Sequence, residues 1–336
     1  MFCQHRTPAA YRAAVTDWET AWQEALYGPR GFYRRPEGPA GHFATSTQGL
    51  GPVAGELLAE ALLALAEHHG LSRVVDVGAG RGELLLALAD TASRRETPVD
   101  LLGVDVVDHP PLLPGRADWL VSPGGAKLPP ALDGLSDTLV VAHEWLDVVP
   151  CPVVELDPEG VWRSLEVTTD GTEHLGPPLG GAELAWLQRW WPGPGARRAE
   201  VGLTRDRAFA DLVARVDRGV VLAVDYGHTR DDRPAAGSLT AYRTGVQVTP
   251  VPDGTCDLTA DVAVDSLGAD LVLTQRAALR SLLGGSAAPD HALASTDPAG
   301  YLRQLGRSSA LAALSAPHGL GAFWWALSGR GGIVLG

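Results

Sequence analysis

The chain has 336 residues, of which 45% are hydrophobic and 20% are charged. This balance is typical of a soluble globular protein with one large α/β domain or two smaller ones, and it argues against a disordered chain. The formal net charge of −13 argues against a nucleic-acid surface, which needs a stripe of Lys and Arg side chains that the sequence does not contain.

The three cysteines, Cys3, Cys151 and Cys256, are far apart and include no CxxC pair. They predict a reducing compartment without a disulfide framework, and we expect no metal site. Residues 1–8 lack the apolar core of a signal peptide, and no stretch approaches the roughly 20 apolar residues of a membrane span. We therefore expect a cytoplasmic protein that binds neither nucleic acid nor membrane.

Helical spacing of apolar side chains predicts a first helix over residues 9–27. A loop rich in Gly, Pro and Arg follows, and residues 52–68 form a strong amphipathic pattern that ends at Gly70. A further helix is predicted to begin at Glu83.

Short apolar segments alternate with these helices, and the expected strands are 74–77, 101–105, 117–121, 138–142, 220–224 and 271–273. Continuous apolar strands are buried on both faces, which indicates a doubly wound, mostly parallel, Rossmann-like α/β sheet. The segment 151–215 interrupts the alternation with a predicted hairpin over 153–168 and a Trp-rich helix around 186–191. We interpret it as an insertion between the fourth and fifth strands that helps to wall the substrate site.

A glycine-rich loop follows the first strand. Its glycines let the backbone turn sharply and approach a ligand with no Cβ in the way. A dinucleotide fingerprint would place its third glycine where Glu83 stands. The pattern Gly-x-Gly-x-Gly, with Asp76 two residues before it, is instead typical of loops that bind S-adenosylmethionine, which carries an ammonium and a sulfonium but no pyrophosphate. The loop residues expected at this cofactor are Gly78, Ala79, Gly80 and Gly82.

Asp105 closes the next predicted strand. An acid at this position can accept hydrogen bonds from both ribose hydroxyls of a nucleoside ligand. The order strand, glycine loop, helix, strand, acid therefore predicts S-adenosylmethionine as the cofactor, in preference to NAD, and S-adenosylhomocysteine as the product. The alternative is that the glycines serve only a tight turn.

Five other segments of the chain are similar to motifs of one known family. These segments are 41–46 (GHFATS), 142–150 (AHEWLDVVP), 225–228 (DYGH), 254–262 (GTCDLTADV) and Thr274-Gln275 with Leu279. Together they resemble the MidA-like family of methyltransferases that use S-adenosylmethionine. That family includes the mitochondrial arginine methyltransferase that acts in the assembly of respiratory complex I. The chain differs from the family pattern at His42 and His143, where the family has Asp and Asn.

The resemblance implies a class I methyltransferase fold with an N-terminal helical cap. It implies that a loop in the N-terminal region covers the cofactor through Phe43, Thr45 and Ser46, although Ser46 or Thr47 could instead cap the following helix. The expected parts are an N-terminal helix and loop (1–50), the first part of the methyltransferase core (51–150), the insertion (151–215) and the second part of the core (216–336).

Acidic residues follow the predicted fourth and fifth strands, whose carboxyl ends meet at one edge of a parallel sheet. Glu144 and Asp147 lie three residues apart, so a helical turn would place both on one side, where they could orient a guanidinium. The residues predicted to be catalytic are Glu144, Asp147, Asp225 and Tyr226, and the resemblance also places His143 and Glu144 at the cofactor. The alternatives are that Glu144 caps a turn, that Asp147 pairs with an arginine, and that Tyr226 only packs.

Residues 143–147 are also similar to the zinc-protease motif H-E-x-x-H, but they follow a strand and lack the second histidine. We expect a methyltransferase, and the resemblance implies a protein arginine as the acceptor. Two alternatives are methylation of a small molecule, with a pocket reshaped by His42 and His143, and an assembly factor that binds the cofactor with little turnover. The sequence leaves the oligomeric state open, and a homodimer is among the states it allows.

Overall fold

The computed structural model describes residues 15–35, 51–111, 113, 115–191, 195–285 and 288–335. Its largest element is a seven-stranded sheet with the order β16-β17-β10-β5-β2-β3-β4. The strands are β2 (Arg73–Val77), β3 (Asp100–Asp105), β4 (Asp118–Val121), β5 (Leu135–His143), β10 (Val216–Asp225), β16 (Leu271–Thr274) and β17 (Trp324–Arg330). The predicted α/β fold is confirmed. The sheet is mixed, because β17, which the sequence analysis did not include, runs antiparallel to both of its neighbours.

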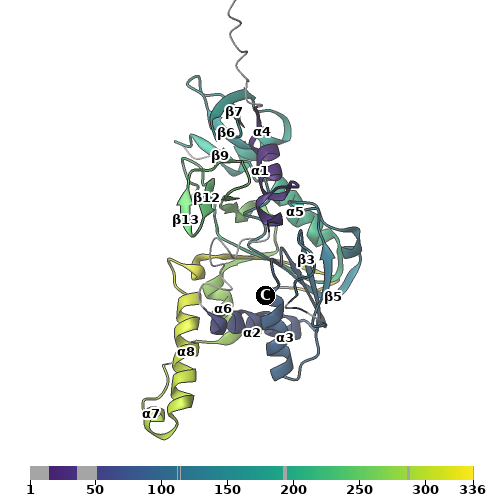
Figure 1. Ribbon diagram of the computed structural model, residues 1–336, viewed down its shortest axis with the longest axis vertical. Helices are drawn as coiled ribbons and strands as arrows, with labels where there is room; N and C mark the ends of the chain where they lie inside the picture. Colours follow the sequence, from purple (N-terminus) through teal and green to yellow (C-terminus); the bar gives the residue numbers. More distant parts are fainter. Residues whose placement is uncertain are drawn as a thin grey trace, which may run out of the picture.

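Helices cover both faces of this sheet (Figure 1). Alternate residues of each central strand point to opposite faces, so the continuous apolar runs of these strands are buried on both faces of the sheet. Leu139 and Val141 of β5 belong to the cluster that contains the apolar side chains of α2 and α3, whereas Val140 packs with those of α5. The helices are α2 (Pro52–His68), α3 (Glu83–Arg94), α5 (Leu203–Ala214) and α6 (Gln275–Leu283).

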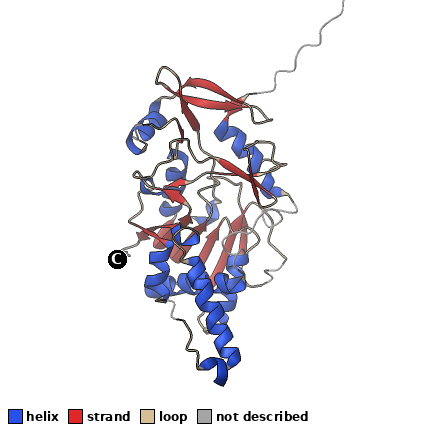
Figure 2. Cartoon of the chain, turned by 90° about the vertical axis from the view of Figure 1, so that its left-hand side faces the viewer, coloured by secondary structure: helices blue, strands red, loops and turns tan. Residues whose placement is uncertain are grey.

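A second sheet lies at the other end of the molecule (Figure 2). Its order is β1-β7-β6-β9, with β8 paired to β7. Its elements are β1 (Thr16–Asp17), β6 (Val153–Leu156), β7 (Trp162–Val167), β8 (Glu173–Pro178) and β9 (Arg198–Glu200), and α4 (Gly181–Trp190) packs against it. The predicted hairpin corresponds to β6 and β7, and the predicted Trp-rich helix corresponds to α4. Helix α1 (Trp18–Tyr27) packs beside this sheet through Trp18, Trp22 and Leu26.

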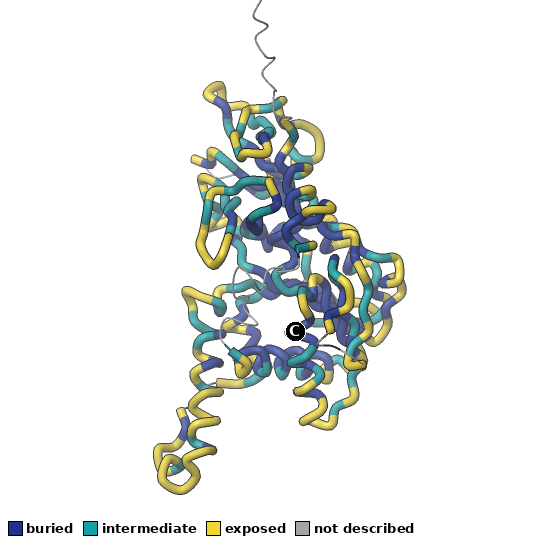
Figure 3. The backbone as a smooth tube through the Cα atoms, in the orientation of Figure 1, coloured by how far each residue is buried: buried dark blue, intermediate teal, exposed yellow. Residues whose placement is uncertain are grey.

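Two small sheets follow β10 in the chain. The strands β11 (Gly227–His228) and β15 (Val262–Ala263) pair in parallel, and β12 (Thr240–Arg243) lies between β13 (Val246–Val248) and β14 (Asp257–Thr259). Helices α7 (Leu293–Thr296) and α8 (Pro298–Leu314) project from the body and are largely exposed (Figure 3).

The first helix is shorter than predicted. Thr16 and Asp17 pair with β7, and the Asp17 carboxylate accepts a hydrogen bond from the backbone N–H of Thr20, so the helix begins at Trp18. Residues 9–14 of the predicted helix lie outside the described residues. The predicted helix 52–68 is confirmed as α2, but its N-cap is Gly51 rather than Ser46 or Thr47. Of the helices that the structure describes, none has the length and apolar character needed to cross a lipid bilayer.

Arg205 of α5 ties the helix to two loops. Its side chain is buried, and its guanidinium donates hydrogen bonds to the backbone carbonyls of Asp147, Val149, Ala260 and Asp261. The guanidinium carbon also lies 5.5 Å from the centre of the Trp22 ring of α1. One side chain therefore joins α5 to α1 and to the loops that follow β5 and β14.

We expect Arg205→Met to lower the free energy of unfolding by about 3 kcal/mol, because four carbonyl groups lose their donor. Arg207→Met is the matched control, since Arg207 lies on the same helix and is exposed, and it should stay within about 0.5 kcal/mol of the wild type. Urea denaturation measures both variants. Equal stability of the two would show that the buried guanidinium does not tie these elements together.

Candidate active site

The glycine loop and the acidic segments meet at one edge of the large sheet. In the parallel register Val77 lies opposite both Val104 and Ala142, and His143 lies opposite Val224. The residues that follow these strands therefore lie next to one another. They line a cavity of about 1120 Å³. This volume lies at the upper end of the usual range for ligand pockets, which is about 300–1,000 Å³.

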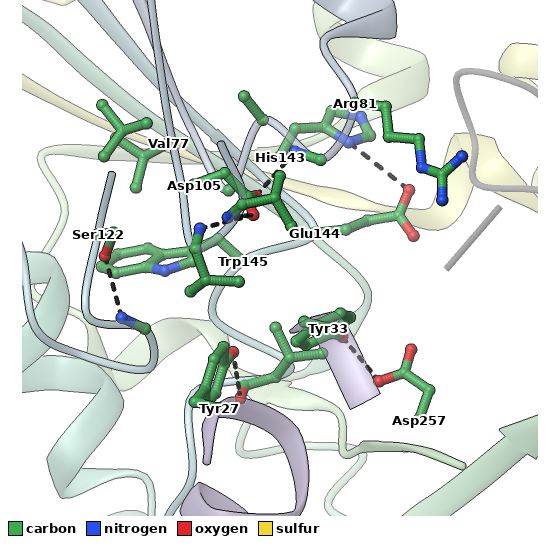
Figure 4. Close-up of a pocket in the computed structure, with 18 of the residues that line it drawn as sticks. Tyr27, Tyr33, Val77, Arg81, Asp105, Ser122, His143, Glu144, Trp145 and Asp257 are labelled. Atoms are coloured by element: carbon green, nitrogen blue, oxygen red, sulfur yellow. Dashed lines mark hydrogen bonds and ion pairs between the residues drawn. The ribbon is translucent and has the colours of Figure 1, made fainter. Parts of the chain in front are cut away.

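The cavity has two halves of different chemistry (Figure 4). The glycine-loop half is lined by Asp76, Gly78, Ala79, Gly80, Asp105, Val106, Ser122 and Gly124. The acidic half is lined by Tyr27, Tyr33, Glu144, Asp147, Tyr226, Tyr242, Asp257, Thr259 and Asp261. The predicted cofactor residues Phe43, Thr45 and Ser46 lie outside the described residues.

The glycine loop presents bare backbone to the cavity. Gly78 and Gly80 have φ angles of +76° and +58°, which residues with a Cβ rarely adopt. A Cβ built on Gly80 would have only one atom within 4 Å, the tip of Glu83 at 3.8 Å. Gly82 does not line the cavity, contrary to expectation. A Cβ there would lie 2.1 Å from the Leu113 side chain, so Gly82 lets α3 begin close to that residue.

Two buried acids surround this loop. The Asp105 carboxylate accepts hydrogen bonds from the backbone N–H groups of Gly80 (2.8 Å) and Val106 (2.6 Å), so it fixes the loop to the end of β3. Burial raises the pKa of Asp105 to about 6 against these hydrogen bonds. Burial, together with the charges of Asp105 and Glu83, raises the pKa of Asp76 to about 8. Such carboxyl groups favour a ligand that brings positive charge.

Glu144 occupies a strained position at the end of β5. Its φ angle is +51°, and its backbone N–H donates to the carbonyl of Val224 at 2.8 Å. The Glu144 side chain is 22% exposed, and its Oε1 lies 3.6 Å from Nδ1 of His143. Burial lowers the pKa of His143 to about 4, so this imidazole is neutral at pH 7.

The helical turn predicted for Glu144 and Asp147 is wrong. Residues 144–149 form bends and turns, because Glu144 is left-handed and the Leu146 N–H donates to Asp225 Oδ2 at 3.0 Å. Glu144 therefore faces the cavity, whereas Asp147 is only 3% exposed. The alternative in which an arginine pairs with the Asp147 carboxylate is not found among the described residues, where Arg205 donates to the backbone carbonyl of Asp147 instead.

Asp147 lies in a cluster of hydroxyl groups. Its Oδ2 accepts hydrogen bonds from Thr259 Oγ1 at 2.7 Å and from the Tyr226 hydroxyl, which also contacts Thr259 Oγ1. The Tyr226 ring packs edge-on against Phe323, with ring centres 5.6 Å apart. The structure thus brings together all four residues that the sequence predicted to be catalytic.

Sequence reasoning missed several aromatic residues of the cavity. Tyr27 ends α1 and Tyr33 lies in the short helix η1 (Phe32–Arg34), and their ring centres are 5.5 Å apart. The Tyr33 hydroxyl donates to Asp257 Oδ1 at 2.7 Å (Figure 4). Trp145 packs against Gly78. No local pattern marks Tyr33, because its partner Asp257 is 224 residues away.

The segment 151–215 does not wall the cavity as expected, since none of the described lining residues comes from it. Its strands β6 and β7 pack instead against α1, and α1 in turn supplies Tyr27. Among the described residues there is also no group of three or more His, Cys, Asp or Glu side chains placed to hold a metal ion.

Comparison with known families decides the reaction class. The model of the family described as "Putative S-adenosyl-L-methionine-dependent methyltransferase" matches residues 53–279. The chain belongs to this family. The methyltransferase is similar in fold to a crystal structure from Burkholderia thailandensis bound to S-adenosylhomocysteine, with a TM-score of 0.74, 23% identity and coverage of 94% of this chain and 88% of that chain. A native crystal structure of a protein from the same organism gives a TM-score of 0.72 with the same identity and coverage. No curated protein sequence matches the chain.

The cofactor of this methyltransferase is S-adenosylmethionine, which supplies a methyl group activated by a sulfonium. The residues present fit it, because bare backbone at Gly80 leaves room for a ligand and the buried acids Asp76 and Asp105 suit its positive charges. The predicted contact between Asp105 and the ribose hydroxyls stays a prediction.

Gly80→Ala should weaken binding of S-adenosylmethionine at least tenfold, because the added methyl group enters the space of the ligand. Gly70→Ala is the matched control: Gly70 has a φ angle of +64°, nothing lies within 4 Å of its Cβ position, and it does not line the cavity. Each variant should lose about 1 kcal/mol of stability from backbone strain. Calorimetric titration measures the affinity, and an equal loss in both variants would remove the loop from the site.

Affinity for S-adenosylmethionine should rise between about pH 6 and pH 8. A protonated carboxyl group does not neutralise a cation, so below their raised pKa values Asp76 and Asp105 must release protons when the cofactor binds. Calorimetry in buffers of different ionisation enthalpy counts these protons. Asp76→Asn should flatten the upper part of the rise, and an affinity that falls with pH would contradict this assignment.

Proposed function

We propose that the methyltransferase transfers a methyl group to an arginine side chain of a protein, as the resemblance to the MidA-like family implies. The observation that carries the proposal is the acidic half of the cavity. Four carboxyl-bearing side chains line this half, and these are Glu144, Asp147, Asp257 and Asp261.

The electrostatics of this half favour a cationic acceptor. Burial raises the pKa of Asp257 well above its ordinary value, and the charges of Asp147 and Glu144 raise it further. Asp147 shows a raised pKa for the same reasons, burial first and then the charge of Glu144. A cation bound among these groups relieves their repulsion, whereas an anion would increase it.

The side chains that line the acidic half suit a planar cation. A guanidinium is always charged and can bond carboxylates in two directions at once. Glu144, which faces the cavity, is placed to orient it, and the aromatic rings of Tyr27 and Tyr33 line the same half across from Glu144. Tyr27 and Tyr33 come from α1 and η1 in the N-terminal part of the chain. Their position at the cavity supports the proposal that this part of the chain covers the site.

The acceptor can be identified with cofactor that carries a labelled methyl group. The methyltransferase is incubated with this cofactor and an extract of source cells that lack the protein, and the labelled protein is hydrolysed to amino acids. We expect the label in methylarginine. Label confined to small metabolites would contradict a protein substrate, and tight cofactor binding without any labelling would favour an assembly factor.

Glu144→Gln should leave the dissociation constant of S-adenosylmethionine within about twofold and lower the initial rate of labelling about 100-fold, because the amide no longer orients a cation. Glu96→Gln is the matched control, since Glu96 is an exposed glutamate with a φ angle of +53° outside the cavity. Full activity of Glu144→Gln would exclude Glu144 from the reaction.

A further inference from the structure

Two buried carboxyl groups lie together where β5 and β10 end. Asp147 and Asp225 are 3% and 2% exposed, and the backbone N–H of Leu146, the residue before Asp147, donates to Asp225 Oδ2 at 3.0 Å. One oxygen of each, Asp147 Oδ1 and Asp225 Oδ1, has no hydrogen-bond partner among the described residues. Two ionised carboxylates side by side in a buried site would repel each other, and a proton held by the pair removes that repulsion.

The charge of the surroundings also fits one shared proton. Arg205 is a buried cation whose charge acts on Asp147, and its hydrogen bonds go to backbone carbonyls rather than to either carboxylate. A pair that holds one proton carries a single negative charge, which balances the charge of Arg205. Two ionised carboxylates would leave an uncompensated buried charge, which is costly.

We infer that Asp147 and Asp225 share one proton, and that this pair takes up the proton that the acceptor loses on methylation, with the Tyr226 hydroxyl as the link to the cavity. The first half of the inference does not depend on the methyl acceptor. The second half rests on the proposed function, because it requires an acceptor nitrogen that carries a proton.

The link follows from the exposure of the three side chains. Asp147 Oδ1 is buried and Asp147 Oδ2 is already hydrogen-bonded, whereas Tyr226 lines the cavity and its hydroxyl donates to Asp147 Oδ2. When the acceptor nitrogen bonds to the methyl carbon, the carbon–sulfur bond breaks with its electron pair left on sulfur. The nitrogen then passes one proton to the Tyr226 oxygen while the Tyr226 proton moves to Asp147. The tyrosine ends unchanged, and the pair becomes neutral.

The other titratable and charged groups around the pair act in the same direction or do not titrate near neutral pH. Glu144, Asp257 and Asp261 contribute negative charge around the pair, and Arg205 contributes positive charge. His143 is neutral at pH 7. Burial raises the pKa values of the neighbouring tyrosines well above the ordinary value of a tyrosine, and these are Tyr27, Tyr33 and Tyr226. The excess of negative neighbours keeps the shared proton in place at neutral pH.

Proton sharing is tested by the pH dependence of unfolding. Folding raises the pKa of Asp225. The protonated Asp225 side chain therefore contributes fully to the free energy of unfolding below the unfolded-state pKa of about 4, and this contribution is lost as the pH rises through the folded-state pKa. Asp225→Asn removes this loss and still offers an oxygen to the Leu146 N–H. The ratio of its folding constant to that of the wild type should therefore increase with pH, by up to about tenfold per pH unit.

Asp217→Asn is the control, because Asp217 lies exposed at the other end of the same strand. Its folding constant should keep a constant ratio to that of the wild type. A constant ratio for Asp225→Asn as well would overturn the shared proton, whatever the methyl acceptor is.

The proton-accepting role is tested by Tyr226→Phe and Asp225→Asn in the labelling reaction. Both should bind S-adenosylmethionine within about twofold of the wild type and transfer methyl at least about 100-fold more slowly. Tyr301→Phe, on the projecting helix α8, should transfer at the wild-type rate. A normal rate in Tyr226→Phe would overturn the link. If the wild type labels no protein while the folding ratio of Asp225→Asn rises with pH, the proposed function fails and the shared proton stands.

Discussion

The parallel pairing of β2, β3, β5 and β10 is the constraint on which the site depends. Parallel strands place their carboxyl ends at one edge, so residues far apart in the chain, such as Gly78, Asp105, Glu144 and Asp225, become neighbours. The pairing is specified by apolar residues buried on both faces, and a shift of one residue would reverse the direction of every side chain. The packing that stabilises the sheet therefore also sets the positions of the acids, although none of the acids contributes to that packing.

Both halves of the cavity concentrate buried acids, and this has an energetic cost. The pKa values of Asp76, Asp105, Asp147 and Asp257 are all raised, chiefly by burial, which means that the empty site opposes their ionisation. Two cationic ligands side by side would repel each other in a low-dielectric cleft. Carboxylates on both walls offset this repulsion. The proposed cationic acceptor, bound beside the sulfonium, would relieve this cost, and the neutral His143 between the halves adds no further charge.

The parts of the site that the sequence predicted are those encoded by short local patterns. Gly78, Gly80, Asp76 and Asp105 are tied to two apolar strands and one helix, and the structure places all four at the cavity. The antiparallel strand β17 was missed because Trp324–Arg330 contains Ser and Gly within a short apolar run, and only its pairing between β10 and β16 defines it. The turn after β5 was predicted as helical because a spacing of three residues also fits a helix. The left-handed conformation of Glu144 has no signature in the sequence.

The acidic half could not be predicted in the same way, because separate segments build it. The hydrogen bonds from Tyr33 to Asp257, from Thr259 to Asp147 and from Tyr226 to Asp147 span 224, 112 and 79 residues. The glycine-loop half, by contrast, uses one continuous unit from β2 to β3 together with the residues at the end of β4. A substitution in η1 or β14 can therefore reshape the acceptor side without moving the cofactor loop. The two halves can therefore vary independently. A match to the glycine loop identifies the cofactor, whereas the acceptor has to be inferred from the tertiary contacts of the acidic half.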